Sequence, residues 1–97
     1  MKIIALEQEK PGYAAADFQP HLRAEAAGVW QLVKVGIIRE TYFNPLEHSA
    51  VLVLECASLE DARQTLAGLP LVQNGLISFE LIPLAPYTGY ERLFSEG

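Results

Sequence analysis

The sequence predicts an α+β fold with the element order β-α-β-β-α-β, in which two helices cover one face of a four-stranded antiparallel sheet. Three observations support this prediction. Four apolar runs are bounded by turn residues, two other stretches repeat apolar residues every three or four positions, and a short Asn-Pro link joins the second run to the third. A chain of 97 residues is large enough for one core, so we expect a single domain over residues 1–97, with residues 85–97 as an aromatic tail.

The strands are expected to be short and joined by recognisable turns. Lys10-Pro11-Gly12 follows the first run, and the link at residues 44–48 fits a hairpin between antiparallel neighbours. The last run is apolar at both even and odd positions, which point to opposite faces of a sheet. We therefore expect the sheet to be covered on both faces, once by the chain's own helices and once by a second copy. The predicted strands are residues 2–8, 37–43, 49–56 and 76–84.

The first helix is expected to begin between Asp17 and Pro20, with Asp17 or Gln19 as its cap, and to end at Gly36. Gly28 inside this helix costs about 1 kcal/mol of stability relative to alanine. Apolar residues at helical spacing predict the face that packs on the sheet, namely Phe18, Leu22, Ala26, Val29 and Val33.

The second helix is expected to open at Ser58, with Asp61 three residues later as a relative of the capping box. It ends at a Gly-Leu-Pro break, which is followed by a short loop containing Asn74-Gly75. Its buried stripe is predicted to be Leu59, Ala62, Leu66 and Leu69. Together with the four strands, these two helices describe a ferredoxin-like arrangement.

Composition excludes several classes of partner and site. The net charge of −5 argues against a nucleic-acid or anionic-membrane surface, because both require an excess of basic residues. The one cysteine, Cys56, excludes an internal disulfide and cannot form a zinc site alone. No stretch approaches the roughly 20 apolar residues that span a bilayer, and the N-terminus lacks a signal-peptide pattern. We expect a soluble, cytoplasmic protein.

One sheet face is left without helices in this arrangement, and its residues are apolar. A self-complementary apolar face is the usual basis of a two-fold dimer. We therefore expect a homodimer or a multiple of dimers. The tail that begins at Ala85 is rich in aromatic residues, and we expect it to cover either a partner subunit or the mouth of a pocket.

The C-terminal half resembles a known family. The Val-Leu-Val-Leu-Glu strand at residues 51–55, the Ser-Leu-Glu-Asp-Ala start at 58–62, the Leu-Ala-Gly-Leu-Pro-Leu break at 66–71 and the Phe-Glu-Leu-Ile-Pro-Leu ending at 79–84 are similar to the muconolactone isomerase-like branch of the dimeric α+β barrel proteins. The N-terminal half resembles this family only in layout. The resemblance implies a face-to-face dimer and a pocket between helices and sheet. In the named enzyme, that pocket isomerises an unsaturated lactone by proton transfer, without metal or organic cofactor.

Cofactor-free proton transfer requires a carboxylate or imidazole in a partly dry pocket. Glu25 lies on the flank of the predicted buried stripe, where desolvation would raise the pKa of its side chain. The alternative is a boundary glutamate, either solvated at its head or paired with His21. His21 could carry protons near neutral pH or be an ordinary surface residue. His21, His48 and Cys56 lack the spacing of metal ligands, so we expect no metal.

Three residues are candidates for holding a substrate. Arg39 could bind a carboxylate, although it could equally pair with Glu55 or Glu80 across the sheet. Tyr42 could donate a hydrogen bond to an enolate oxygen. Trp30 lies off the apolar stripe and could line a pocket or simply pack at a contact.

Two functions are compatible with these residues. The first is a small cofactor-independent enzyme, an isomerase or monooxygenase, acting on a hydrophobic acid or lactone, with Glu25 or His21 moving the proton. The second is a non-catalytic ligand-binding or assembly module, in which the same polar residues are only interface pairs. Neither requires an organic cofactor.

Overall fold

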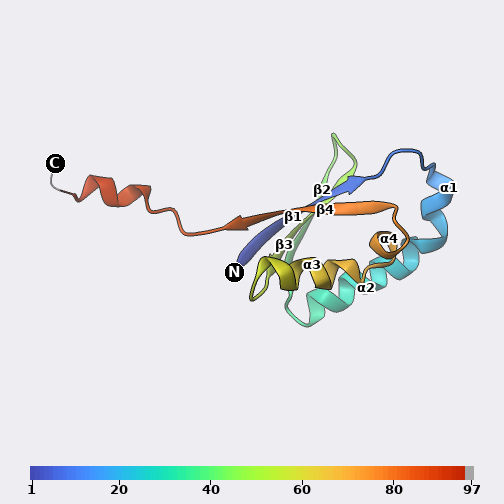
Figure 1. Ribbon diagram of the computed structural model, residues 1–97, viewed down its shortest axis with the longest axis horizontal. Helices are drawn as coiled ribbons and strands as arrows, with labels where there is room; N and C mark the ends of the chain where they lie inside the picture. Colours follow the sequence, from blue (N-terminus) through green and yellow to red (C-terminus); the bar gives the residue numbers. More distant parts are fainter. Residues whose placement is uncertain (96–97) are drawn as a thin grey trace.

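The computed structural model describes residues 1–95; residues 96–97, the end of the predicted tail, lie outside the described residues. The four strands form one antiparallel sheet in the order β2-β3-β1-β4 (Figure 1). The predicted α+β, ferredoxin-like fold is confirmed, and each strand lies within one or two residues of its predicted bounds. These strands are β1 Lys2–Glu9, β2 Ile38–Asn44, β3 Ser49–Glu55 and β4 Ile77–Leu84.

The longer helices lie on one side of this sheet, as predicted (Figure 1). Within residues 1–95, no helix is both long and apolar enough to cross a membrane. The helical segments, including two short 3-10 turns, are α1 Ala15–Phe18, η1 Gln19–His21, α2 Leu22–Lys34, α3 Leu59–Ala67, α4 Pro70–Gln73 and η2 Gly89–Leu93. The segment α4 occupies the break where the sequence indicated only a turn and a loop.

The first helical region begins earlier than predicted. Its first segment, α1, starts at Ala15, and the backbone N–H of Ala14 donates to Oδ2 of Asp17 at 2.7 Å. Asp17 therefore caps the helix from inside its first turn rather than from the residue before it. A 3-10 turn containing Pro20 then separates α1 from α2.

This 3-10 turn also changes which residues of α2 face the core. A 3-10 helix advances by about 120° per residue instead of about 100°, so a stripe extrapolated from Phe18 loses its register. Leu22 is 44% exposed and Ala26 is exposed, which corrects the predicted stripe. The half-buried positions in α2 are Glu25, Gly28, Val29, Leu32 and Val33.

Gly28 is required by the packing of α2 against the segment after α3. A Cβ atom at this position would lie 3.0 Å from Cδ2 of Leu69, a buried core residue. The close approach of these two segments explains a glycine in the middle of a helix.

The hydrophobic core lies between the sheet and its helices. The side chain of Ser58 accepts a hydrogen bond from the N–H of Asp61 at 3.1 Å, so the predicted cap of α3 is confirmed. In the hairpin, Oδ1 of Asn44 accepts from the N–H groups of Leu46 and Glu47 and stabilises the turn. The main core cluster consists of Ile3, Ala5, Ile38, Leu52, Leu54, Ala62, Leu66 and Leu69.

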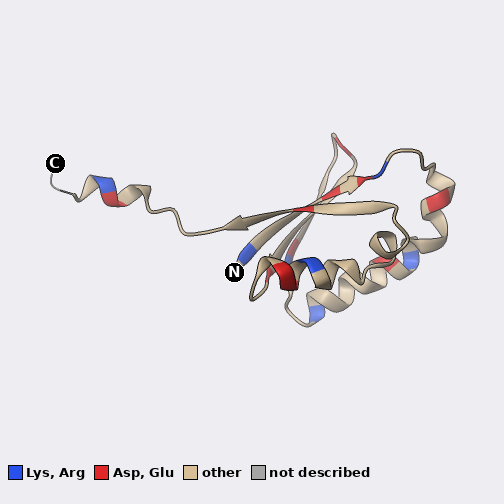
Figure 2. Cartoon of the chain, in the orientation of Figure 1, with Lys and Arg blue, Asp and Glu red and all other residues tan. Residues whose placement is uncertain are grey.

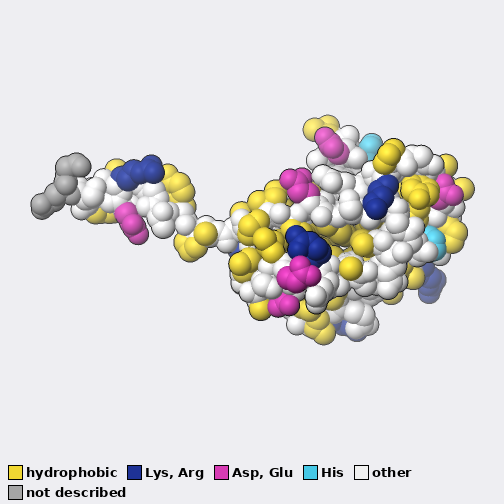
Figure 3. All heavy atoms as spheres, viewed as in Figure 1, with side chains coloured by type: hydrophobic (Ala, Val, Ile, Leu, Met, Phe, Trp, Pro, Cys, Tyr) yellow, Lys and Arg dark blue, Asp and Glu magenta, His cyan; other side chains and the backbone are white. Residues whose placement is uncertain are grey.

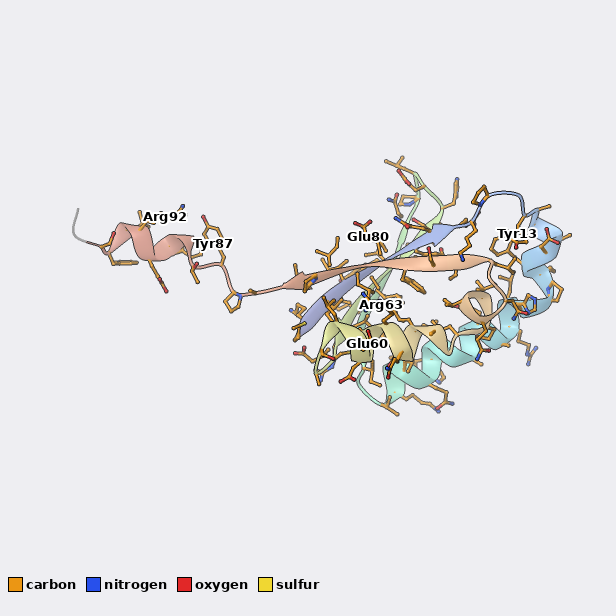
Figure 4. All side chains as sticks on the ribbon, in the orientation of Figure 1. Tyr13, Glu60, Arg63, Glu80, Tyr87 and Arg92 are labelled. Carbon is orange, nitrogen blue, oxygen red and sulfur yellow. The ribbon has the colours of Figure 1, made fainter. Side chains whose placement is uncertain are left out.

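The other sheet face is not covered by any element within residues 1–95. Alternation along the paired strands places Glu80 of β4 on this open face, and Figure 4 shows Glu80 on the opposite side of the sheet from Glu60 and Arg63 of α3. The last strand is thus divided between the faces, with Ser78 and Glu80 interrupting its apolar residues on the open side. The apolar side chains of the open face are Ile4, Leu6, Tyr42, Val51, Val53, Ile82 and Leu84.

The tail extends away from the sheet along the longest axis of the molecule (Figure 1). The molecule measures 60 × 29 × 21 Å along its principal axes. It leaves the end of β4 at Leu84, which pairs with Lys2 at the start of β1. Tyr87 and Tyr90 pack edge to face, with ring centroids 5.0 Å apart, yet both remain exposed. Figure 3 shows hydrophobic side chains on the surface of the tail.

Candidate functional site

A cleft of about 390 Å³ opens at the end of the sheet that lies farthest from the tail. Figure 4 shows Tyr13, one of its lining residues, beside α1 at this end. The wall is formed by the end of β1, the loop after it, the α1–α2 region and α4. The lining residues are Glu7, Glu9, Tyr13, Ala15, Phe18, Gln19, Leu22 and Leu71.

Glu25 lies next to this cleft and is held by a backbone group. The N–H of Leu71, which lines the cleft, donates to Oε1 of Glu25 at 2.9 Å. Burial raises the pKa of Glu25 above its ordinary value of 4.5; the Leu71 hydrogen bond opposes this shift, and the negative charge of Glu7 adds to it. A carboxyl group with these properties is suited to general acid-base chemistry.

Glu7 is a second acidic residue of the site that the sequence interpretation missed. Its side chain lines the cleft, and its Oε1 accepts a hydrogen bond from the N–H of Ala50 at 2.9 Å. The signal was present in the sequence, because Ile3, Ala5 and Glu7 alternate along β1 and must therefore share the face that carries the core.

His21 and Arg39 occupy different places around α2. His21 is the half-buried residue just before α2, between two residues that line the cleft, while Glu25 binds Leu71 rather than His21. Arg39 lies beyond the opposite end of α2, where its Nε donates to the carbonyl of Gly36. Nine helical steps separate Glu25 from Lys34, the last residue of α2, which corresponds to about 14 Å along the axis, and Gly36 lies beyond that end. The structure therefore does not bring Arg39 together with Glu25.

Glu55, one of the alternative partners expected for Arg39, forms an ion pair with the N-terminus of the chain. The ammonium group of Met1 lies 2.9 Å from Oε2 of Glu55. This hydrogen bond lowers the pKa of Glu55, and the nearby charge of Arg39 contributes in the same direction. Arg39 thus belongs to a charged group at the edge of the sheet near the N-terminus.

Tyr42 and Trp30 lie outside the cleft. Tyr42 is on the open sheet face, where its hydroxyl donates to Oε1 of Glu40 at 2.6 Å, and this bond raises the pKa of Tyr42. Trp30 is 58% exposed on α2. Of the five candidate residues, Glu25 adjoins the cleft through Leu71 and His21 precedes the lining residue Leu22 in sequence, whereas Arg39, Tyr42 and Trp30 lie elsewhere on the chain.

Neither Cys56 nor His48 is among the residues that line the cleft. Burial raises the pKa of the Cys56 thiol, and the negative charge of Asp61 acts in the same direction. The ring of His48 lies 6.2 Å from that of Phe43 in the exposed hairpin. Among residues 1–95, no group of three or more His, Cys, Asp and Glu side chains is arranged to hold a metal ion.

Comparison with solved structures finds the same arrangement in another protein. The matching structure is 5-chloro-2-hydroxyhydroquinone dehydrochlorinase (TftG) from Burkholderia phenoliruptrix AC1100, in complex with 2,5-dihydroxybenzoquinone. This fold is shared with a dehydrochlorinase. The match to TftG has a TM-score of 0.62 and covers 92% of this chain and 98% of TftG, at 14% sequence identity. At that identity, the similarity to TftG shows the fold alone. No family model and no curated protein matches the sequence.

Proposed function

We propose that this protein is a small cofactor-independent enzyme, isomerase-like in type, that transfers a proton on a hydrophobic acid or lactone. The observation that carries the proposal is the half-buried carboxyl group of Glu25 beside the cleft, with its raised pKa and its hydrogen bond from Leu71. The C-terminal half resembles the muconolactone isomerase-like group, and TftG, which shares the fold, forms a complex with a small ring compound, 2,5-dihydroxybenzoquinone.

The proposed reaction uses only groups of this chain. Glu25 takes a proton from the carbon next to the substrate carbonyl, and the electron pair of the broken C–H bond moves into an enolate. The enolate then recovers the proton from Glu25 at another carbon of the conjugated system, which shifts the double bond. Tyr13 lines the cleft with a hydroxyl group that can donate to the enolate oxygen. His21, which precedes the lining residue Leu22 in sequence, is the second candidate for moving the proton.

Hydrogen exchange tests this proposal without knowledge of the product. A small unsaturated γ-lactone is incubated with the protein in D₂O, and the loss of its acidic C–H signal is followed by ¹H NMR. We expect the protein to accelerate exchange and Glu25→Gln to abolish the acceleration. Glutamine retains an oxygen that can accept from the Leu71 N–H, so this variant removes the base while keeping the contact.

A control identifies effects that are unrelated to the proposed base. Glu60→Gln makes the same chemical change on the surface of α3, where Glu60 pairs with Arg63 in solvent. This variant should exchange the lactone at the wild-type rate. Equal acceleration by the wild type and Glu25→Gln would contradict the role of Glu25.

The second candidate function is a non-catalytic ligand-binding or assembly module. It is favoured by the Glu25–Leu71 hydrogen bond, which also satisfies a buried backbone donor and therefore has a structural use. In this case the folded wild-type protein leaves the lactone exchange unchanged, although it still binds ring compounds in the cleft.

For either function we propose assembly through the open sheet face. Its central apolar side chains are half-buried within one chain, and Tyr42 at its edge is 58% exposed. Packing this face on its copy would bury these side chains and form a barrel from two sheets. The proposed assembly is therefore a dimer or a multiple of dimers, in which Tyr42 would lie at the interface.

A further inference from the structure

The cleft wall has an uneven distribution of charge. Glu7 and Glu9 line it directly, Glu25 lies next to it, and none of its lining residues within the described chain is lysine or arginine. Figure 2 shows acidic residues at the end of β1 and in α1, the elements that border the cleft. Arg39, the expected partner of a substrate carboxylate, lies beyond the far end of α2.

The carboxylates are near enough to affect one another. Burial is the largest cause of the raised pKa of Glu25, and the negative charge of Glu7 adds to it, so a further negative charge beside Glu25 is disfavoured. A carboxylate ligand would enter the same partly desolvated region. It would lose hydration without gaining a cationic partner from the cleft wall.

The rest of the wall suits a ring. Phe18, Leu22 and Leu71 supply apolar surface, and Tyr13 supplies an aromatic face with a hydroxyl group. A volume of about 390 Å³ is in the range of small-molecule sites. An aromatic wall beside carboxylates can also accept a cation.

We propose that the cleft selects uncharged or cationic ring compounds and rejects the corresponding carboxylates. This inference rests on the proposed function only in taking the cleft as the substrate site. Of the two substrate types named above, it selects the neutral lactone over the free acid.

Three ligands of nearly equal shape test the proposal, namely benzamide, benzylamine and benzoate. Binding to the full chain is measured by NMR titration at pH 7 and low salt, with chemical shifts at Tyr13 and Leu71 locating the site. We expect benzamide and benzylamine to bind, and benzoate to bind about tenfold or more weakly than benzamide, as like charges separated by several ångströms require.

Removing charge from the wall should change this preference selectively. Glu7→Gln keeps an oxygen for the Ala50 N–H, and Glu9→Gln lies at the exposed end of β1, so both variants are expected to fold. Each should strengthen benzoate binding several-fold relative to benzamide binding, which shifts the ratio of the two affinities. Glu60→Gln on α3 removes the same charge away from the cleft and should alter neither affinity.

Two outcomes would overturn the proposal. One is benzoate binding in the cleft as tightly as benzamide, and the other is failure of all three ligands to bind there. The lactone exchange experiment is independent of these outcomes. Exchange that depends on Glu25 together with tight benzoate binding would reject the charge selection alone, whereas selective binding without exchange would reject the enzyme proposal alone.

Discussion

The backbone N–H of Leu71 donates to Oε1 of Glu25 across 2.9 Å and 46 residues of sequence. This contact joins the first turn of α2 to α4, and it places a titratable group beside the cleft. Its structural and chemical roles can be separated because glutamine and alanine differ in whether they can accept from Leu71.

The free energy of unfolding that is lost on substitution of Glu25 should depend on the replacing residue. Glu25→Ala leaves the N–H of Leu71, a residue only 4% exposed, without its acceptor, so we expect a loss of about 1–3 kcal/mol in the free energy of unfolding. Glu25→Gln should change stability by less than about 1 kcal/mol at pH 7. Urea denaturation of the three proteins checks this. If Glu25→Ala and Glu25→Gln lost the same free energy of unfolding, the hydrogen bond from Leu71 would not be the source of the stability that Glu25 provides.

The raised pKa of Glu25 predicts a pH dependence of stability. The folded state binds the Glu25 proton more tightly than the unfolded state, so the contribution of this group is fully present below 4.5, its ordinary value. That contribution is lost as pH rises through the raised folded-state pKa. We expect the stability of the wild type, taken relative to Glu25→Gln, to decline across this interval. A difference that is constant from pH 4 to pH 8 would contradict the shift.

Gly28→Ala should destabilise the protein, although alanine favours an exposed helix by about 1 kcal/mol. The new methyl group would meet Leu69 at 3.0 Å in the core, and we expect a net loss of about 1 kcal/mol from this overpacking. Adding Leu69→Ala removes the obstructing atoms. In that background Gly28→Ala should become neutral or stabilising, as a double-mutant cycle in urea would reveal.

The open sheet face should control assembly. Light scattering of the wild type should give at least twice the chain mass of 10.7 kDa. Val53→Asp places a charge in the centre of the face and should yield monomers, whereas Leu46→Asp in the exposed hairpin should not. Tyr42→Lys, at an exposed position of the same face, provides a second variant if Val53→Asp does not fold. Unchanged mass for folded variants of both positions would place the interface elsewhere.

Removal of the tail tests a separate contribution. A chain that ends at Pro86 lacks Tyr87, Tyr90 and η2 but keeps the entire sheet. We expect it to retain the dimer mass, because the proposed interface lies on the sheet. Dissociation of the shortened chain would instead assign the tail the role of a clasp between subunits.

Most of the fold could be predicted from local patterns. The hairpin at residues 44–48, the Ser58 cap and the alternation in the strands depend on neighbours in sequence, so their signals are readable without a structure. The register of the first helical region could not be predicted in this way. The 3-10 turn at Gln19–His21 rotates α2, and that turn gave no separate periodic signal.

The candidate site was likewise only partly predictable from local sequence patterns. Glu25 was identified from its position beside an apolar stripe, and Glu7 could have been identified from strand alternation. Their proximity depends on how the helices pack on the sheet, and the hydrogen bond from Leu71 to Glu25 depends on the position of α4. The residue type of Arg39 suits a substrate carboxylate, but the length of α2 separates it from the cleft.

Residue patterns within each segment were therefore sufficient for the strands, the caps and the ferredoxin-like order of elements, because hydrophobic periodicity and backbone capping are local properties. The composition of the cleft, its negative wall and the requirement for glycine at position 28 were decided by tertiary packing. These features arise from side chains and backbone groups that are distant along the chain and meet only when the helices pack on the sheet, so no local pattern contains them.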